Sequence, residues 1–196
     1  MNKKNIMKYL SCHCACTEAI YNQAMRTTAS DIENARDQKT SRIRSMISAV
    51  RLEVHKMRGY VRLSPLGDKT LYGYMRPKHN IGEMVSNIMA HRYPNMIIVL
   101  GNSNKSWISL YTSEGISYMS DGPLEKVVEK LGQLTKTSGE KTDIEGVWDV
   151  YYKSQYRPER RNLKYFHQNM TLTSMRSVRP KPESNKNGAT LDSFME

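Results

Sequence analysis

A row of polar side chains recurs at steps of three and four in segment 41–62. Its members are Ser48 and four side chains that can bind anions, Arg44, Arg51, His55 and Arg58. Side chains at this spacing share one face of a helix. A guanidinium offers a planar fork of donors and a permanent charge, which suits phosphate. The row therefore predicts a contact surface for a nucleic-acid backbone, although a solvated helix face would show the same pattern.

His55 lies within this row and is the candidate catalytic group if the protein is an enzyme. Imidazole exchanges protons near neutral pH, and His79 offers the same chemistry elsewhere. A lone histidine on a basic face more often donates a hydrogen bond to phosphate. The sequence contains no serine-hydrolase, phosphate-loop or zinc-protease motif, and its acids are scattered rather than grouped for magnesium. Enzymatic activity stays open, and we predict no cofactor.

A second basic cluster lies between residues 151 and 182. Its cations are interleaved with tyrosines and comprise Arg157, Arg160, Arg161 and Lys164. Cations of this kind bind phosphates, and tyrosine rings can stack on unpaired bases. The alternative is a solvated basic turn whose tyrosines belong to the core. We predict that this cluster, the row in segment 41–62 and Arg62 converge on one DNA-binding surface.

The segment that carries the row also has an apolar stripe, which predicts that it is an amphipathic helix. The stripe consists of Ile43, Met46, Ile47, Val50, Val54 and Met57. We expect this side to be buried and the row to lie opposite it. Gly59 suits the left-handed residue that ends many helices, and Arg62 would then lie on the following strand.

The remaining pattern alternates amphipathic helices with short apolar strands. This order predicts an α+β fold, an antiparallel sheet of about five strands packed with amphipathic helices. Asn80 and Glu83 have the spacing of a capping box. We expect one domain, 1–176, followed by a flexible tail, 177–196. The expected elements are helices at 17–36, 80–93, 123–134 and 143–151, and strands at 60–63, 71–75, 96–100, 105–112 and 116–119.

Cys12, Cys14 and Cys16 form a Cys-x-Cys-x-Cys run that includes His13. Such soft ligands could hold zinc or an iron–sulfur centre. Ligands this close together crowd one tetrahedron, however, and no second pair of cysteines follows, as structural zinc sites usually require. We therefore predict that the three cysteines pack at the start of a helix and bind no metal.

The composition favours a polyanionic partner. Thirty lysines and arginines against nineteen acids give a formal net charge of +11, an excess typical of nucleic-acid-binding proteins. No apolar run approaches the roughly 20 residues of a membrane span, and no secretory signal is evident. Three cysteines suit a reducing compartment. We expect a cytoplasmic protein without a membrane partner.

The last eight residues carry apolar side chains after a polar stretch that we expect to be a disordered tether. Leu191, Phe194 and Met195 would share one side of a helical turn. The octet resembles the sliding-clamp (PCNA) interaction box of archaeal replication and repair proteins, which implies an aliphatic role for Leu191 and an aromatic role for Phe194. Gly188 and Met195 depart from the usual glutamine and aromatic residue, which predicts weak affinity. Alternatively, the tail folds back on its own core.

Four short blocks, 53–62, 76–80, 91–94 and 159–162, are similar in order to those of a domain-of-unknown-function family described as a probable DNA-metabolism protein. The similarity spans about residues 42–172. Members occur beside or fused to uracil-DNA glycosylases, and beside a radical-SAM protein, in bacteria and archaea. The resemblance implies a DNA-repair setting and makes a uracil-DNA glycosylase a candidate partner.

Together these features predict a DNA-binding accessory protein in repair or replication that the PCNA clamp recruits. One alternative is a repair enzyme of glycosylase or nuclease type that acts on damaged or modified bases. The other is an RNA-binding protein, since the same charges would serve RNA.

Overall fold

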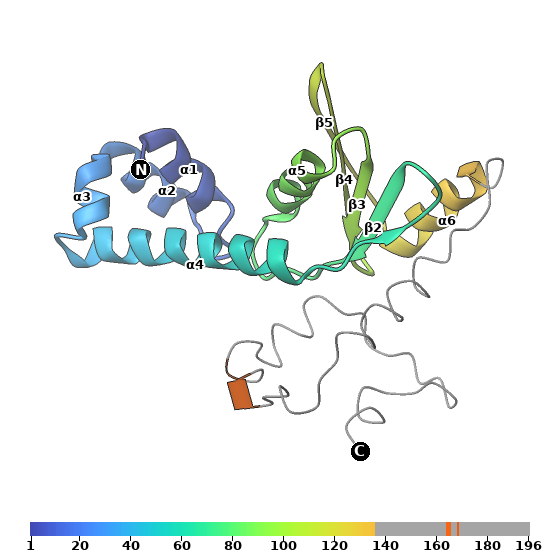
Figure 1. The fold of residues 1–196 in the computed structure, drawn as a ribbon. Helices are drawn as coiled ribbons and strands as arrows, with labels where there is room; N and C mark the ends of the chain where they lie inside the picture. Colours follow the sequence, from blue (N-terminus) through green and yellow to red (C-terminus); the bar gives the residue numbers. More distant parts are fainter. Residues whose placement is uncertain (136–163, 166–167, 169–196) are drawn as a thin grey trace.

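The computed structural model describes residues 1–135, 164–165 and 168. Within them, the chain forms six helices and a five-stranded sheet, which confirms the α+β class (Figure 1). No helix among the described residues is long and apolar enough to span a membrane. The elements are α1 (Lys3–Ser11), α2 (Glu18–Arg26), α3 (Ala29–Asn34), α4 (Gln38–Tyr60), β1 (Ser64–Pro65), β2 (Thr70–Tyr74), α5 (Gly82–Arg92), β3 (Ile97–Gly101), β4 (Ser106–Thr112), β5 (Gly115–Asp121) and α6 (Leu124–Thr135).

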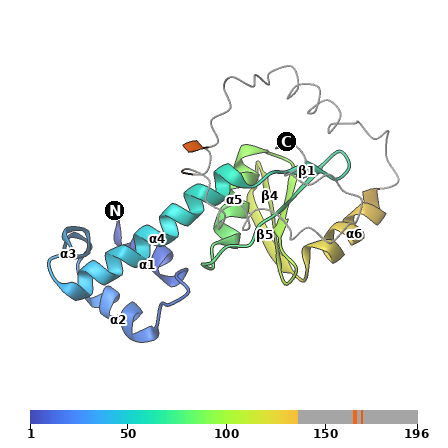
Figure 2. The same ribbon diagram turned by 90° about the horizontal axis from the view of Figure 1, so that it is seen from below.

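The helix α4 connects two parts of the molecule. A capping box at Asp37 and Thr40 starts it, and its 23 residues extend for about 35 Å. Figures 1 and 2 show α1, α2 and α3 around its first half and the sheet with α5 beyond its second half. The predicted apolar stripe is buried along its whole length, so α4 contributes to both cores.

The predicted end of α4 was wrong. The helix continues through Gly59, which keeps a negative φ, and Val61 closes it by donating its N–H to the Met57 carbonyl at 3.0 Å. Because the hydrogen-bond ladder runs on without interruption, no left-handed residue is needed. Arg62 consequently lies in the connection between α4 and β1, not on a strand.

The expected helix at 17–36 is two helices, α2 and α3. Thr27 and Thr28 interrupt it with extended ψ angles of 144° and 155°. The Thr28 hydroxyl accepts a hydrogen bond from the Asp31 N–H at 3.1 Å and starts α3. A threonine side chain competes in this way for the backbone donors of a helix. The helix α1, which the sequence pattern did not predict, packs Ile6 and Leu10 against this layer.

The five strands follow the order β1-β2-β3-β4-β5, but β2 and β3 are parallel. The prediction of an antiparallel sheet was wrong at this pair only. The chain leaves β2 and crosses through α5 before it enters β3, so both strands run in the same direction. In the predicted hairpin at 60–75, the first strand shrinks to Ser64–Pro65 because α4 extends to Tyr60.

The central strand β3 has a core on each side. Ile98 and Leu100 pack with α4 and α5, whereas Val99 packs with Leu124 and Val127 of α6. The helix α5 lies so close to β4 that a Cβ on Gly82 would come within 1.9 Å of the Trp107 ring. The predicted capping box at Asn80 and Glu83 is absent. The helix begins after Ile81 without a side-chain cap.

Candidate nucleic-acid interface

The structure places the predicted row on the exposed surface of α4. Arg44, Ser48, Arg51, His55 and Arg58 are all solvent-exposed. The row borders the buried stripe and does not lie opposite it, since Arg51 and His55 line the same pocket as the buried Val54. Apolar side chains therefore lie beside the cations.

This pocket is an open hollow of about 480 Å³ formed by three helices. The helix α4 supplies the cations, while Tyr9 of α1 and Ile88 of α5 supply apolar surface. The complete lining is Tyr9, Ser48, Arg51, Leu52, Val54, His55, Arg58 and Ile88. An anionic group could bind to the arginines while an attached ring or sugar contacts the apolar side chains.

Two guanidinium groups bind backbone carbonyls at the last turn of α4. Arg62 donates to the Gly59 carbonyl at 3.4 Å, and Arg92 donates to the Arg58 carbonyl at 3.2 Å. Cations at this position satisfy helix carbonyls and complement the negative end of the helix dipole. Arg92 was absent from the predicted surface. Its packing beside Arg58 depends on how α5 docks on α4, which the local sequence pattern does not encode.

His55 is held by its neighbour in the row. Arg58 Nη2 lies 3.3 Å from His55 Nδ1. A guanidinium only donates, so Nδ1 must be the acceptor and Nε2 carries the proton in this arrangement. Within the described residues, no acid forms an ion pair with Arg44, Arg51 or Arg58. The positive charge of the row is therefore not neutralised by a described side chain.

The remaining predicted contact residues are mostly outside the described chain. Arg157, Arg160 and Arg161 lie there, as do the predicted clamp-binding residues Leu191, Phe194 and Met195. Lys164 is described and exposed. The convergence of the two basic clusters on one surface stays a prediction.

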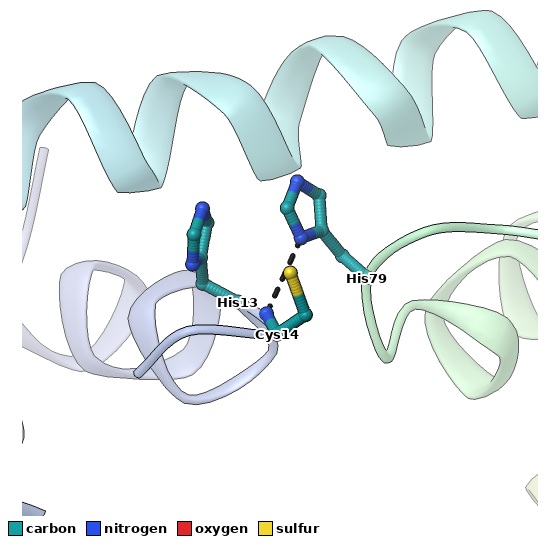
Figure 3. Close-up of side chains that lie close together, drawn as sticks. All are labelled: His13, Cys14 and His79. Atoms are coloured by element: carbon teal, nitrogen blue, oxygen red, sulfur yellow. Dashed lines mark hydrogen bonds between the residues drawn. The ribbon is translucent and has the colours of Figure 1, made fainter. Parts of the chain in front are cut away.

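The three cysteines lie in the turn between α1 and α2. Cys12 ends α1, Cys16 lies just before α2, and Cys14 is exposed between them. Burial is the largest effect on the Cys12 and Cys16 thiols and raises the pKa of both. The structure adds a residue that sequence reasoning did not connect with them. His79, only 6% exposed, lies against His13 and Cys14 (Figure 3).

Four hydrogen bonds hold this contact together. The Glu53 carboxylate accepts the Lys78 N–H at 2.6 Å and the His79 N–H at 2.9 Å. The Asn80 N–H donates to the Cys12 carbonyl at 2.8 Å, and the Cys14 N–H donates to His79 Nδ1 at 3.3 Å. Glu53 lies on α4 on the side away from the arginine row, by the helical spacing of about 100° per residue. One helix thus carries two distinct polar sites.

His13 has a perturbed protonation equilibrium. Burial lowers the pKa of its imidazole, and the neighbouring His79 and Lys78 charges lower it further, against a smaller opposing effect of Glu53. The His13 and His79 ring centroids lie 4.3 Å apart. A positive charge on His13 would therefore lie beside a second imidazole, which agrees with the direction of its pKa shift.

These features define a basic α+β protein with an arginine-lined pocket and a cysteine–histidine cluster. The chain belongs to a family described as a domain of unknown function, DUF4130, whose model matches residues 2–177. The match is longer than the segment 42–172 predicted from the motif blocks and includes α1, α2 and α3. No curated protein and no solved structure matches the chain.

Proposed function

We propose that the protein binds DNA through the row on α4 and acts as an accessory factor in DNA repair or replication. The observation that carries this proposal is the pocket beside the row, where exposed arginines without a described acidic partner adjoin an aromatic and an aliphatic side chain. Phosphates would bind Arg44, Arg51 and Arg58, with Arg62 and Arg92 extending the surface at the end of α4. Tyr9 and Ile88 would contact a sugar or an unstacked base.

The salt dependence of DNA binding follows from the number of phosphates that the protein neutralises. Each phosphate contact on duplex DNA contributes about −0.9 to the slope of log K against log salt. Three contacts from the row alone would give a slope of about −2.7. Further contacts from Arg157, Arg160, Arg161 and Lys164 would make the slope steeper.

The test compares two single-charge variants on the same helix. Arg51→Ala removes a cation from the row, whereas Arg42→Ala removes an exposed cation from another side of α4. Fluorescence anisotropy with labelled duplex and single-stranded DNA over a salt series should show a slope about 0.9 shallower for Arg51→Ala only. Equal losses in both variants would mean that net charge alone attracts DNA, and the proposal would be wrong. Tighter binding to matched RNA would instead favour an RNA-binding protein.

Recruitment to the PCNA sliding clamp is proposed from the C-terminal octet. Leu191 and Phe194 would insert into the clamp, with Met195 in the weaker third position. A pull-down with the full chain and Leu191→Ala plus Phe194→Ala tests this directly. Unchanged clamp capture by the double variant would remove the clamp from the proposal without affecting the DNA interface. The same experiment can report a uracil-DNA glycosylase as a copurifying partner.

A second candidate function is supported by the position of His55. It lines a hollow whose volume lies within the range of about 300 to 1,000 Å³ typical of small-ligand sites. A repair enzyme acting on damaged or modified bases could use His55 as an acid or base. Base release or strand cleavage that His55→Ala abolishes without loss of DNA affinity would favour this function over the accessory role.

A further inference from the structure

We propose that His13, Cys14 and His79 form a zinc-binding site that fastens the turn between α1 and α2 to the loop before α5. One possible ligand atom from each of the three residues lies within 4.8 Å of the others. The proposal is independent of DNA binding, because the site and the arginine row lie on different sides of α4. Figure 3 shows the two imidazoles and the thiol gathered beneath α4 from two separate loops.

The loops that carry these ligands are held in place without the metal. The Asn80 N–H donates to the Cys12 carbonyl, and the Glu53 carboxylate accepts the Lys78 and His79 amides. His79 is thereby fixed in a buried position, although 65 residues separate it from Cys14. Glu53 thus positions the backbone that carries His79, so this imidazole lies at the site before any metal binds.

The donor set selects the class of metal. Imidazole nitrogen and thiolate sulfur are the ligands of zinc and related transition ions, whereas calcium and magnesium prefer oxygen. The Glu53 carboxylate, whose charge acts on His13, already accepts two backbone amides. Cys14 would lose its thiol proton to solvent on binding, as zinc ligation by cysteine requires. The fourth position of the tetrahedron would be taken by water.

The structure also indicates what must move. Zinc–nitrogen bonds of about 2.0 Å and zinc–sulfur bonds of about 2.3 Å place tetrahedral ligands roughly 3.5 Å apart. Ligand atoms spread over as much as 4.8 Å must therefore approach one another by about 1 Å. Cys14 is exposed and can make this adjustment. The hydrogen bond from its N–H to His79 Nδ1 is long, at 3.3 Å, and is the contact most readily exchanged for a metal bond.

The soft ligands evident in the sequence were the three cysteines and His13, which lie close together. Ligands this close crowd one tetrahedron when all of them bind, and the run Cys12, Cys14 and Cys16 has no distant ligand in the sequence to complete it. His79 supplies that distant ligand, and His13 supplies the second imidazole. The proposed set therefore uses only one of the three cysteines, and this makes Cys16 a matched control for Cys14.

Cobalt binding to the full chain tests the proposal. Reduced protein freed of metal by a chelator is titrated with Co²⁺, and the thiolate-to-cobalt absorption band and the visible bands of tetrahedral cobalt are recorded. We expect one Co²⁺ per chain, displacement by Zn²⁺, and a higher midpoint of thermal unfolding with Zn²⁺. Cys14→Ser should abolish the thiolate band, while Cys16→Ser should retain it.

Two histidine variants complete the experiment. His13 is partly exposed, so His13→Gln should keep the fold. This variant should bind Co²⁺ at least about 100-fold more weakly, as expected for the loss of one of three ligands. His79→Gln should also weaken Co²⁺ binding. Circular dichroism of this variant shows whether the chain is still folded, so that the weaker binding can be assigned to the lost ligand. Absence of stoichiometric metal binding, or a thiolate band that survives Cys14→Ser and disappears in Cys12→Ser or Cys16→Ser, would overturn the site.

Discussion

Glu53 should stabilise the fold by more than an ordinary helix glutamate. Its carboxylate accepts two backbone amides across 25 and 26 residues of sequence. A hydrogen bond to a charged group contributes about 1.5 to 3 kcal/mol when it is shielded from water. The Lys78 amide is at an exposed residue and water can replace the carboxylate there, so we expect about 2 kcal/mol for the pair in Glu53→Ala. In a chain of this size that is a fall of about 4 to 8 °C in the unfolding midpoint.

The matched control is Glu129→Ala on α6, where the glutamate is exposed and forms no ion pair with a described residue. Surface substitutions of this kind change stability by within about 0.5 kcal/mol. Chemical denaturation of both variants and of the parent chain, with chelator present, measures the difference. If Glu53→Ala lowers the free energy of unfolding by no more than Glu129→Ala does, the Glu53 carboxylate does not hold the loop before α5.

Two further predictions concern packing and pH. Gly82→Ala should lower the unfolding free energy by about 1 to 3 kcal/mol, because the added Cβ would overlap the Trp107 ring. Urea denaturation measures this change. The control is Gly122→Ala, since a Cβ at Gly122 would meet nothing within 4 Å. The lowered pKa of His13 predicts that the metal-free protein loses stability as pH falls from 6.5, because the unfolded chain then binds a proton that the folded chain resists. His13→Gln should flatten that part of the stability profile; an unchanged slope would contradict the assignment.

The amphipathic elements were predictable because buried side chains recur along the sequence with the period of the helix or strand that carries them. The stripe from Ile43 to Met57 repeats every three to four residues, and the same repeat places the arginine row on one face. The central position of β3 followed from its continuous apolar run between 96 and 100. These inferences need only the geometry of a single element.

Features that depend on docking between elements were missed. The parallel pairing of Leu71 with Ile98 arises because α5 crosses between their strands, and no local pattern distinguishes it from a hairpin. The contact of His79 with Cys14 joins two loops that the sequence separates. The end of α4 was misjudged because Gly59 permits a left-handed conformation but does not impose one.

The two sites on α4 are joined through the helices that flank it. Tyr9 of α1 and Ile88 of α5 line the pocket, and the loops adjoining these helices are tied together by Glu53, Asn80 and Cys12. Loss of the Glu53 carboxylate should let those apolar side chains shift away from the arginine row. The proposed DNA interface would then lose part of its contact surface.

This coupling and simple electrostatics predict opposite results for Glu53→Ala. The substitution raises the formal net charge from +11 by one, so charge attraction alone would tighten DNA binding. A displaced pocket wall would weaken it instead, at every salt concentration and without a shallower salt slope, because no phosphate-binding cation is removed. Anisotropy titrations of the folded variant decide between the two. Tighter binding would show that the pocket walls do not contribute to the interface.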